Sequence, residues 1–300
     1  MTRLLFIFLC GATVIFGKAT HKSTKHSTTT TESTTTVNST TVKLLCEGVL
    51  VHGKLHKREV IMNGINRPYQ LAAYNHVHQI FFSYNVGEDT KDTFGIAYVK
   101  EGDTMPTDVH GVKNGFALAI DDHEDKVYFG GSEGIYSSDL KNPKVLSYIL
   151  EDRDIWDIFY HKKHLYIIEF PSQRLHKYDI KGKKIHHLEH ITHKVYQVAI
   201  DGDDDMFITT KLGLFEIKNG SDHTIHYSDA PKSFRAIEVN HKGVAYFCSI
   251  SSLYVADKES HSLKEIASIK NIFGVTFDSE DNIIYSNPHE IVKLLPHSCK

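Results

Sequence analysis

The stretch Tyr196-Gln197-Val198-Ala199-Ile200-Asp201 returns in related form about every 40 residues along the chain. Close copies, each led by an aromatic side chain, begin at residues 69, 116, 156 and 273, and a blurred copy, one residue out of register, begins at residue 234. The six aromatic starts are therefore separated by 47, 40, 40, 38 and 39 residues. Self-similarity at such a period is typical of a repeat architecture, in which each repeat is one structural unit.

Each unit of the repeat predicts four short β-strands. After the aromatic-led phrase comes a polar turn, such as residues 201–205, whose Asp and Gly residues suit tight hairpins. Short runs rich in aromatic and β-branched residues follow, and this composition indicates strands. Examples are 127–129 for a second strand, 214–217 for a third and 185–188 for a fourth. Six units of four strands predict an all-β fold, a six-bladed β-propeller.

The two ends of the repeat array predict how the ring closes. The sixth unit stops at residues 291–294, which are its third strand, so its fourth strand is missing. A spare strand-like run, residues 57–62, precedes the first phrase at the spacing of a fourth strand. We therefore expect an N-terminal strand to complete the last blade, which leaves no open sheet edge.

The N-terminus predicts two segments ahead of the propeller. Arg3 precedes an apolar run over residues 4–16, and small residues frame a cleavage site near residue 19. Residues 1–19 are thus interpreted as a secretory signal peptide, too short for a membrane anchor. Residues 20–43 are mostly Thr and Ser, a composition that cannot bury a core and predicts a disordered, O-glycosylated stalk. The propeller then occupies residues 44–300.

The mature chain is expected to be a secreted, soluble monomer. Loss of Arg3 and Lys18 with the signal peptide takes the formal charge from −3 to −5, and an acidic secreted protein has no electrostatic reason to bind nucleic acid. No second apolar run approaches the length of a membrane span, so no membrane partner is expected. Two N-glycosylation sequons begin at Asn38 and at Asn219, the latter in a predicted surface turn.

Three cysteines remain after the signal peptide. Cys46 lies just before the closing strand and Cys299 just after the last blade. A disulfide between them would join the two ends at the ring seam, where it would close a long loop. Cys248 lies within an apolar strand and is expected to be a buried free thiol. Pairing of Cys248 with one of the end cysteines is the alternative.

Neither a catalytic residue nor a cofactor is predicted. The acidic turn at 201–205 resembles the start of a calcium-binding loop, but Met206 stands at its sixth position and Leu212 at its twelfth, where Gly and Glu are required. The interpretation as a solvated hairpin turn is therefore preferred. Histidines cluster at His186, His187, His190 and His193. Either they form a surface copper or zinc site, or they are solvated side chains on an outer strand.

The residues where the inner strands begin form the candidate ligand site. In a propeller the first strand of each unit borders the central channel, so residues at its start converge on one mouth. Packing between blades is one interpretation of the aromatic rings there. Their Asn, Arg and Asp neighbours favour a binding mouth, because rings with a few polar groups typically line small-molecule sites. The candidates are Asn66, Arg67, Tyr69, Asn114, Phe116, Asp154, Trp156, Asp157, Tyr196, Arg235, Asn271 and Phe273.

Longer phrases of the chain resemble the insect ommochrome-binding protein family. They keep their order over residues 45–300 and comprise 66–71, 81–84, 111–117, 127–136, 154–158, 170–173, 273–275 and 282–285. The resemblance implies a secreted haemolymph protein that binds ommochromes, which are tryptophan-derived phenoxazinone pigments, or hydroxykynurenine-type precursors. It implies binding without catalysis. The Thr-rich stalk and the abundant histidines depart from the family.

A ligand of this chemistry suits the predicted mouth. A flat phenoxazinone would stack against rings such as Trp156, Arg67 and Arg235 could pair with its carboxylates, and Asp154 or Asp157 with its ammonium group. Two other classes remain open. One is a metal-dependent hydrolase of the lactonase type, although inner positions rich in aromatic residues, Gln and Ala supply few ligands for a hard cation. The other is a secreted propeller that binds protein partners.

Overall fold

A computed structural model of the chain describes residues 47–87 and 92–298. The expected signal peptide and stalk, the sequon at Asn38, and Cys46 and Cys299 with their expected disulfide all lie outside the described residues. In the part that is described, the one helical element is a 3-10 turn, η1 (Asn75–Val77). Across the same ranges no helix is long and apolar enough to cross a membrane.

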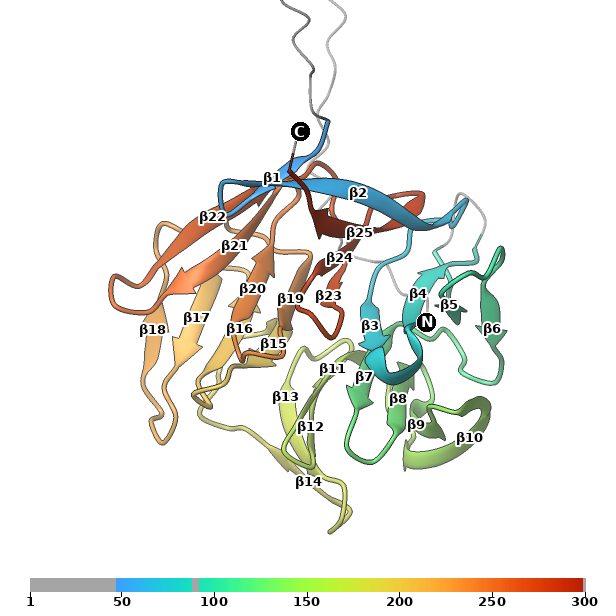
Figure 1. The fold of residues 1–300 in the computed structure, drawn as a ribbon. Coiled ribbons are helices and arrows are strands. Elements are labelled where there is room, and N and C mark those ends of the chain that lie inside the picture. Colours follow the sequence, from blue (N-terminus) through green and yellow to red (C-terminus); the bar gives the residue numbers. More distant parts are fainter. Residues whose placement is uncertain (1–46, 88–91, 299–300) are drawn as a thin grey trace, which may run out of the picture.

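Six antiparallel sheets surround a central axis, so the predicted six-bladed β-propeller is confirmed (Figure 1). From the channel outward, blade 1 contains β3 (Leu71–Tyr74), β4 (Gln79–Asn85), β5 (Phe94–Lys100) and β6 (Thr107–Val109). Blade 2 contains β7 (Ala117–Asp121), β8 (Lys126–Gly131), β9 (Gly134–Asp139) and β10 (Asn142–Glu151). Blade 3 contains β11 (Ile155–His161), β12 (His164–Glu169), β13 (Leu175–Asp179) and β14 (Lys184–His187).

The other three blades follow the same order. Blade 4 contains β15 (Val195–Ile200), β16 (Met206–Thr210), β17 (Gly213–Ile217) and β18 (Thr224–His226). Blade 5 contains β19 (Ala236–Val239), β20 (Ala245–Cys248), β21 (Ser252–Asp257) and β22 (Ser262–Ser268). Blade 6 contains β23 (Val275–Phe277), β24 (Ile283–Ser286) and β25 (Glu290–Pro296), followed by β2 (Lys54–Asn63) and β1 (Val49–Val51).

The ring closes where the sequence predicts. Strand β2, which includes the spare run at 57–62, pairs antiparallel with β25, and Val60 lies opposite Val292. The structure adds β1, a fifth strand that the sequence did not predict, on the outer edge of β2. Just after β1, the backbone N–H of His52 donates to the carbonyl of Ile266 in blade 5 at 2.8 Å. The N-terminal hairpin therefore completes blade 6 and also joins it to its neighbour.

A polar residue ends most of the aromatic-led phrases because it caps the turn that follows. Asp201 is only 4% exposed, and its Oδ1 accepts the backbone N–H groups of Asp203 and Asp205 at 3.0 Å each. Asp278 and Asn240 bind the turns of blades 6 and 5 in the same way. This local bonding by Asp and Asn fixes a tight hairpin between the first two strands of a blade.

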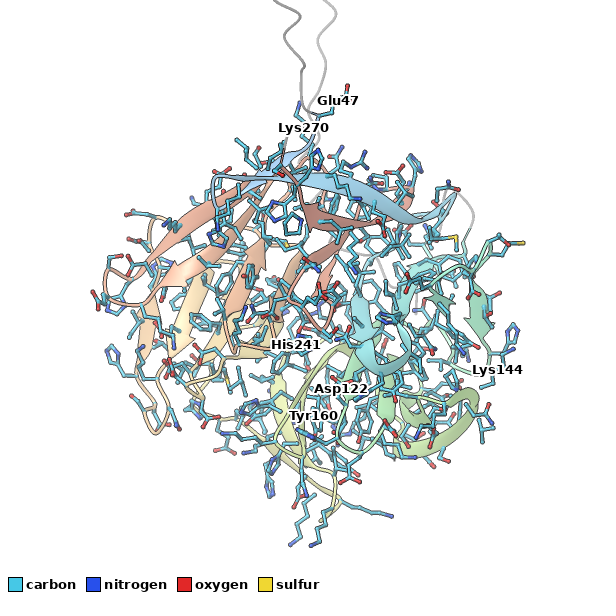
Figure 2. The ribbon with its side chains drawn as sticks, viewed as in Figure 1. Glu47, Asp122, Lys144, Tyr160, His241 and Lys270 are labelled. Carbon is cyan, nitrogen blue, oxygen red and sulfur yellow. The ribbon has the colours of Figure 1, made fainter. Side chains whose placement is uncertain are left out.

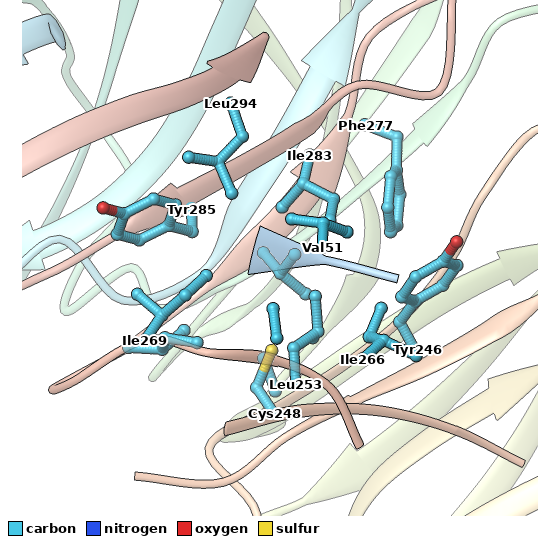
Figure 3. Packing of buried hydrophobic residues seen from close by; sticks show 14 of the residues in the cluster. Val51, Tyr246, Cys248, Leu253, Ile266, Ile269, Phe277, Ile283, Tyr285 and Leu294 are labelled. Atoms are coloured by element: carbon cyan, nitrogen blue, oxygen red, sulfur yellow. The ribbon is translucent and has the colours of Figure 1, made fainter. Parts of the chain in front are cut away.

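Cys248 is a free thiol in the packed core between blades 5 and 6, as predicted. Its side chain is fully buried and packs with Val51, Leu253 and Ile266 in one hydrophobic cluster (Figure 3). Burial raises the pKa of the thiol well above its usual range. The group therefore stays protonated and behaves as a small apolar side chain.

Candidate functional site

The inner strands start in a shared register, and this explains the blurred fifth repeat. The backbone N–H groups of Tyr69, Phe116, Arg235 and Phe273 each donate to a carbonyl on the second strand of their own blade, at 2.8–2.9 Å. Arg235, and not Phe234, therefore takes the place that aromatic residues hold in the other blades. We call the channel end formed by Tyr69, Phe116, Trp156, Arg235 and Phe273 the aromatic end.

Rings pack against one another across the floor of the aromatic end. Tyr69 and Phe116 are less than a tenth exposed, and so is Phe94. Phe94 meets Tyr69 edge-on with ring centres 5.5 Å apart and Phe116 at 4.8 Å, and Tyr69 stacks on Phe273 at 5.2 Å. Sequence reasoning missed Phe94 because it begins a third strand. Tyr69, Phe94 and Phe116 thus serve as packing. The more exposed side chains beside them are the ones that a ligand could contact.

Trp156, Tyr196, Arg235 and Phe273 keep part of their surface exposed. Trp156 is held by a hydrogen bond from its Nε1 to the Tyr196 carbonyl at 2.8 Å and by a tilted contact with Phe116 at 5.7 Å between ring centres. The Arg235 guanidinium lies 4.5 Å above the Phe273 ring. The aromatic end therefore presents two fixed ring surfaces and one cation, groups that suit a flat anionic ligand.

The predicted polar neighbours have a backbone role. Arg67, Asn114 and Asn271 have φ values of 52°, 50° and 59°, and Asn in particular tolerates this left-handed conformation. The turn that enters an inner strand thus accounts for the recurrence of Asn without a ligand. Asn66 donates from Nδ2 to the Asn85 carbonyl at 3.1 Å, while Asp154 is half-buried.

The charges of Arg67 and Arg235 both act on the hydroxyl group of Tyr69. Arg67 is exposed and pairs with Asp92 at 3.4 Å. Burial raises the pKa of the Tyr69 hydroxyl, Asp92 adds to the rise, and the charges of Arg67 and Arg235 oppose it. The structure therefore brings Arg67, Tyr69, Arg235 and Phe273 together.

Asp157 lies one residue deeper in the channel than Trp156 and is only 7% exposed. Its Oδ1 accepts the side-chain N–H of Gln70 from blade 1 at 3.3 Å. Burial raises the pKa of Asp157 to about 8, opposed by the backbone N–H groups of Ile158 and Val198 and assisted by the charge of Glu238. Burial likewise raises the pKa of Glu238 to about 7. The middle of the channel thus holds two carboxyl groups that resist ionisation.

Sequence reasoning missed Glu238. In the register that Arg235 sets, Glu238 lies opposite Tyr246 on the second strand, and the equivalent residues of blades 1 and 2 are Ala72 and Ala119. A charged residue at a place that other repeats give to alanine was the available signal. The one-residue shift of the fifth repeat concealed it.

The opposite end of the channel opens into a hollow of about 270 Å³, which we call the acidic end. All six inner strands or their following turns line it, and Asp122, Tyr160 and His241 lie near the centre of the ring in Figure 2. Neither Lys nor Arg is among its described lining residues. Those used below are Ala73, Asp122, Phe159, Glu238, His241 and Phe277.

A larger groove, about 570 Å³, lies between blades 3 and 4. Its charged groups are mostly paired: Lys162 contacts Asp204 at 2.6 Å, and Lys218 contacts Asp205 at 3.0 Å. Asn219 of the second sequon is exposed in the turn at its edge. None of the residues of the aromatic end is among the described lining residues of this groove.

The predicted histidine cluster is dispersed. His190 lines the groove between blades 3 and 4, the His187 ring packs on His176 at 5.1 Å, and His193 stacks on Phe215 at 5.6 Å. Among the described residues, these histidines do not converge as a set of three metal ligands. Solvated and packed side chains therefore account for them better than a copper or zinc site.

Asp201, Asp203 and Asp205 do converge, but a lysine lies among them. The Lys258 Nζ of blade 5 contacts the carboxylates of Asp203 at 2.9 Å and Asp205 at 2.7 Å, and it also pairs with Asp201. These contacts raise the pKa of Lys258, against the effect of burial. The ammonium group supplies the cation that this acidic turn requires, which agrees with the exclusion of a calcium loop from the sequence.

Comparison with known proteins finds a distant relative and several solved propeller structures. No protein-family model matches it. It is 29% identical over 252 residues to the ommochrome-binding protein of Manduca sexta, across 83% of this chain and 90% of that protein. This indicates a distant relationship and supports a binding role.

Solved structures share the fold. A gluconolactonase from Xanthomonas campestris superposes with a TM-score of 0.65 at 12% identity, over 84% of this chain and 96% of that one. A streptogramin B lyase superposes with a TM-score of 0.58 at 12% identity, over 81% and 98%. At such low identity these likenesses establish the architecture alone.

Proposed function

We propose that this protein binds ommochrome pigments or related tryptophan-derived metabolites at the aromatic end of its channel, without acting on them chemically. The distant relationship to an ommochrome-binding protein carries the proposal, because it spans 83% of this chain and 90% of that protein. The aromatic end supplies the physical reason. Its exposed rings and its arginines match a flat ligand that bears carboxylates.

Each part of the site has a separate task. Trp156 and Phe273 offer stacking surfaces, while the packed rings of Tyr69 and Phe116 hold them from beneath. Arg235 lies against Phe273 and is partly buried, so a carboxylate paired with it would be shielded from water. Asp157 is buried below this floor, whereas Asp154 is half-buried just before the strand begins, so Asp154 is better placed to meet an ammonium group.

We also propose that the protein is secreted into haemolymph as an N-glycosylated monomer, joined at the ring seam by a disulfide between Cys46 and Cys299. Exposure of Asn219 in a turn is compatible with glycan attachment. The free state of Cys248 leaves the two outer cysteines to pair with each other. Non-reducing peptide mapping and removal of N-glycans, each followed by mass spectrometry, test these points.

Truncation of Trp156 tests the binding site. It is the single tryptophan of the chain, so its fluorescence reports on the aromatic end. Trp156→Ala is expected to weaken pigment binding about thirtyfold, or about 2 kcal/mol, as truncation of an aromatic anchor commonly does. Equilibrium dialysis read by pigment absorbance measures this.

Two control variants separate stacking from misfolding. Trp156→Phe keeps a ring and should retain most of the affinity. Tyr148→Ala removes a ring that is 48% exposed on an outer strand, and it should leave pigment affinity unchanged. Unchanged affinity in a folded Trp156→Ala protein would contradict binding at the aromatic end. Tightly bound divalent metal in the purified protein, with lactone hydrolysis, would favour the hydrolase alternative.

A further inference from the structure

The acidic end has the size and wall chemistry of a ligand site that the proposed pigment site does not use. Its walls include the partly exposed Ala73 and Phe159, together with Phe277. Its volume of about 270 Å³ lies just under the range of roughly 300–1,000 Å³ for drug-sized ligands. An occupant would therefore have one or two rings.

The charges of the hollow select a cation. Two carboxyl groups line it, Glu238 on strand β19 and Asp122 in the turn after β7. The two imidazoles nearby already contact carboxylates, His241 with Asp281 at 3.2 Å and His161 with Asp204 at 2.7 Å. Because no lysine or arginine is among the described lining residues, an entering ammonium group would meet no like charge from such a side chain and would favour the ionised form of Glu238.

Glu238 has unused capacity to accept hydrogen bonds. Its Oε1 accepts the backbone N–H of Val239 at 3.0 Å. Within residues 47–87 and 92–298 no other donor reaches its carboxylate. An ionised carboxylate in a largely desolvated place is costly unless it is paired. An ammonium group at Glu238 would supply this pairing, and the partly exposed ring of Phe159 lines the same hollow.

We propose that the acidic end is a second binding site, which takes a compact organic amine with its ammonium group on Glu238 and its ring against the partly exposed Phe159. The site lies at the opposite end of the channel from Trp156 and Arg235. It therefore stands independently of the proposed pigment site.

Calorimetric titration of the full-length protein with 2-phenylethylamine tests the proposal. We expect binding of the amine to the wild type and at least tenfold weaker binding of 3-phenylpropionate, which has a similar shape and the opposite charge. Glu238→Gln keeps the acceptor for the Val239 N–H and should weaken amine binding at least tenfold. Ala73→Leu should block the hollow, with the same result.

Variants at the aromatic end distinguish the two sites. Trp156→Ala should leave amine affinity unchanged, and Glu238→Gln should leave pigment affinity unchanged. The proposal would be overturned by absence of amine binding to the wild type, by equal binding of 3-phenylpropionate, or by full amine affinity in folded Glu238→Gln. Loss of pigment affinity in Glu238→Gln but not in Trp156→Ala would overturn the existence of two separate sites.

Discussion

At the aromatic end of the channel Tyr69, Phe94 and Phe116 are less than a tenth exposed, whereas at the acidic end Ala73 and Glu238 keep part of their surface open. The same six inner strands build both ends. Large rings stand where the strands begin, and they fill the space where the strands converge. Further along, alanines such as Ala73 and Ala119 line a hollow, so the channel is blocked beneath the exposed faces of Trp156 and Phe273 and stays open at the acidic end.

The junction between blades 6 and 1, beside the aromatic end, is tightly packed. A Cβ on Gly274 would lie 1.9 Å from the Tyr69 carbonyl oxygen. The Gly274 backbone N–H donates to the Ser286 hydroxyl at 2.9 Å, and that hydroxyl donates to the Pro68 carbonyl at 2.8 Å. Blades 6 and 1 thus meet backbone to backbone, where no side chain fits.

The largest expected effect is on stability, when side-chain atoms are added at each end of the channel. Gly274→Ala should destabilise the fold by about 3 kcal/mol or more, because the displaced partner is backbone. Ala73→Leu adds more atoms but places them in a hollow, and it should change stability by less than about 1 kcal/mol. Urea unfolding measures both. Similar losses in the two variants would contradict the contrast between a packed and an open end.

The second prediction concerns the carboxyl group between the two ends. Asp157 titrates near 3.8 when unperturbed and near 8 in the fold. Between these pH values the folded state holds a proton that the unfolded state lacks, so stability falls as pH rises. The slope is about 1.4 kcal/mol per pH unit for one full proton. The neighbouring Glu238, whose pKa is about 7, acts in the same direction.

Asp157→Asn should therefore flatten the pH dependence and raise Tm at pH 8.5 relative to the wild type. Each kcal/mol corresponds to about 2–4 °C for a domain of this size. Asp222→Asn, at a side chain that is 86% exposed, serves as the control and should follow the wild type. Parallel curves for all three proteins between pH 6 and pH 8.5 would show that Asp157 is ionised in the fold.

The sequence predicted the frame of the molecule better than its channel. Blade number and ring closure followed from the spacing of one phrase and from a missing strand, because every blade repeats the same local pattern. Strand β1 did not, because it is a fifth strand with no counterpart in the other blades. The one-residue shift of the fifth repeat and Arg235 were recognised in the sequence, but Glu238, which this shift brings into the channel, was missed.

Contacts between distant segments explain the other omissions. Phe94 enters the aromatic end from a third strand, where the repeat shows no aromatic pattern, and Lys258 reaches the acidic turn of blade 4 from blade 5. Neither contact leaves a mark in the local sequence. The Asn residues were interpreted as ligand-binding groups, whereas positive φ gives Asn114 and Asn271 a backbone reason.

The smallest expected effect is on pigment affinity, when an arginine of the aromatic end is replaced by lysine. Arg235→Lys keeps a cation but loses the planar fork and the stacking on Phe273, so carboxylated pigments should bind about fivefold more weakly, or about 1 kcal/mol. Arg67→Lys, at a side chain that is 48% exposed, should change affinity less, because exposed ion pairs contribute little. A decarboxylated pigment analogue should bind both variants like the wild type, as should 2-phenylethylamine at the acidic end. If Arg235→Lys instead weakened the analogue as much as the parent pigment, the contribution of Arg235 would lie in supporting the Phe273 ring and not in pairing with a carboxylate.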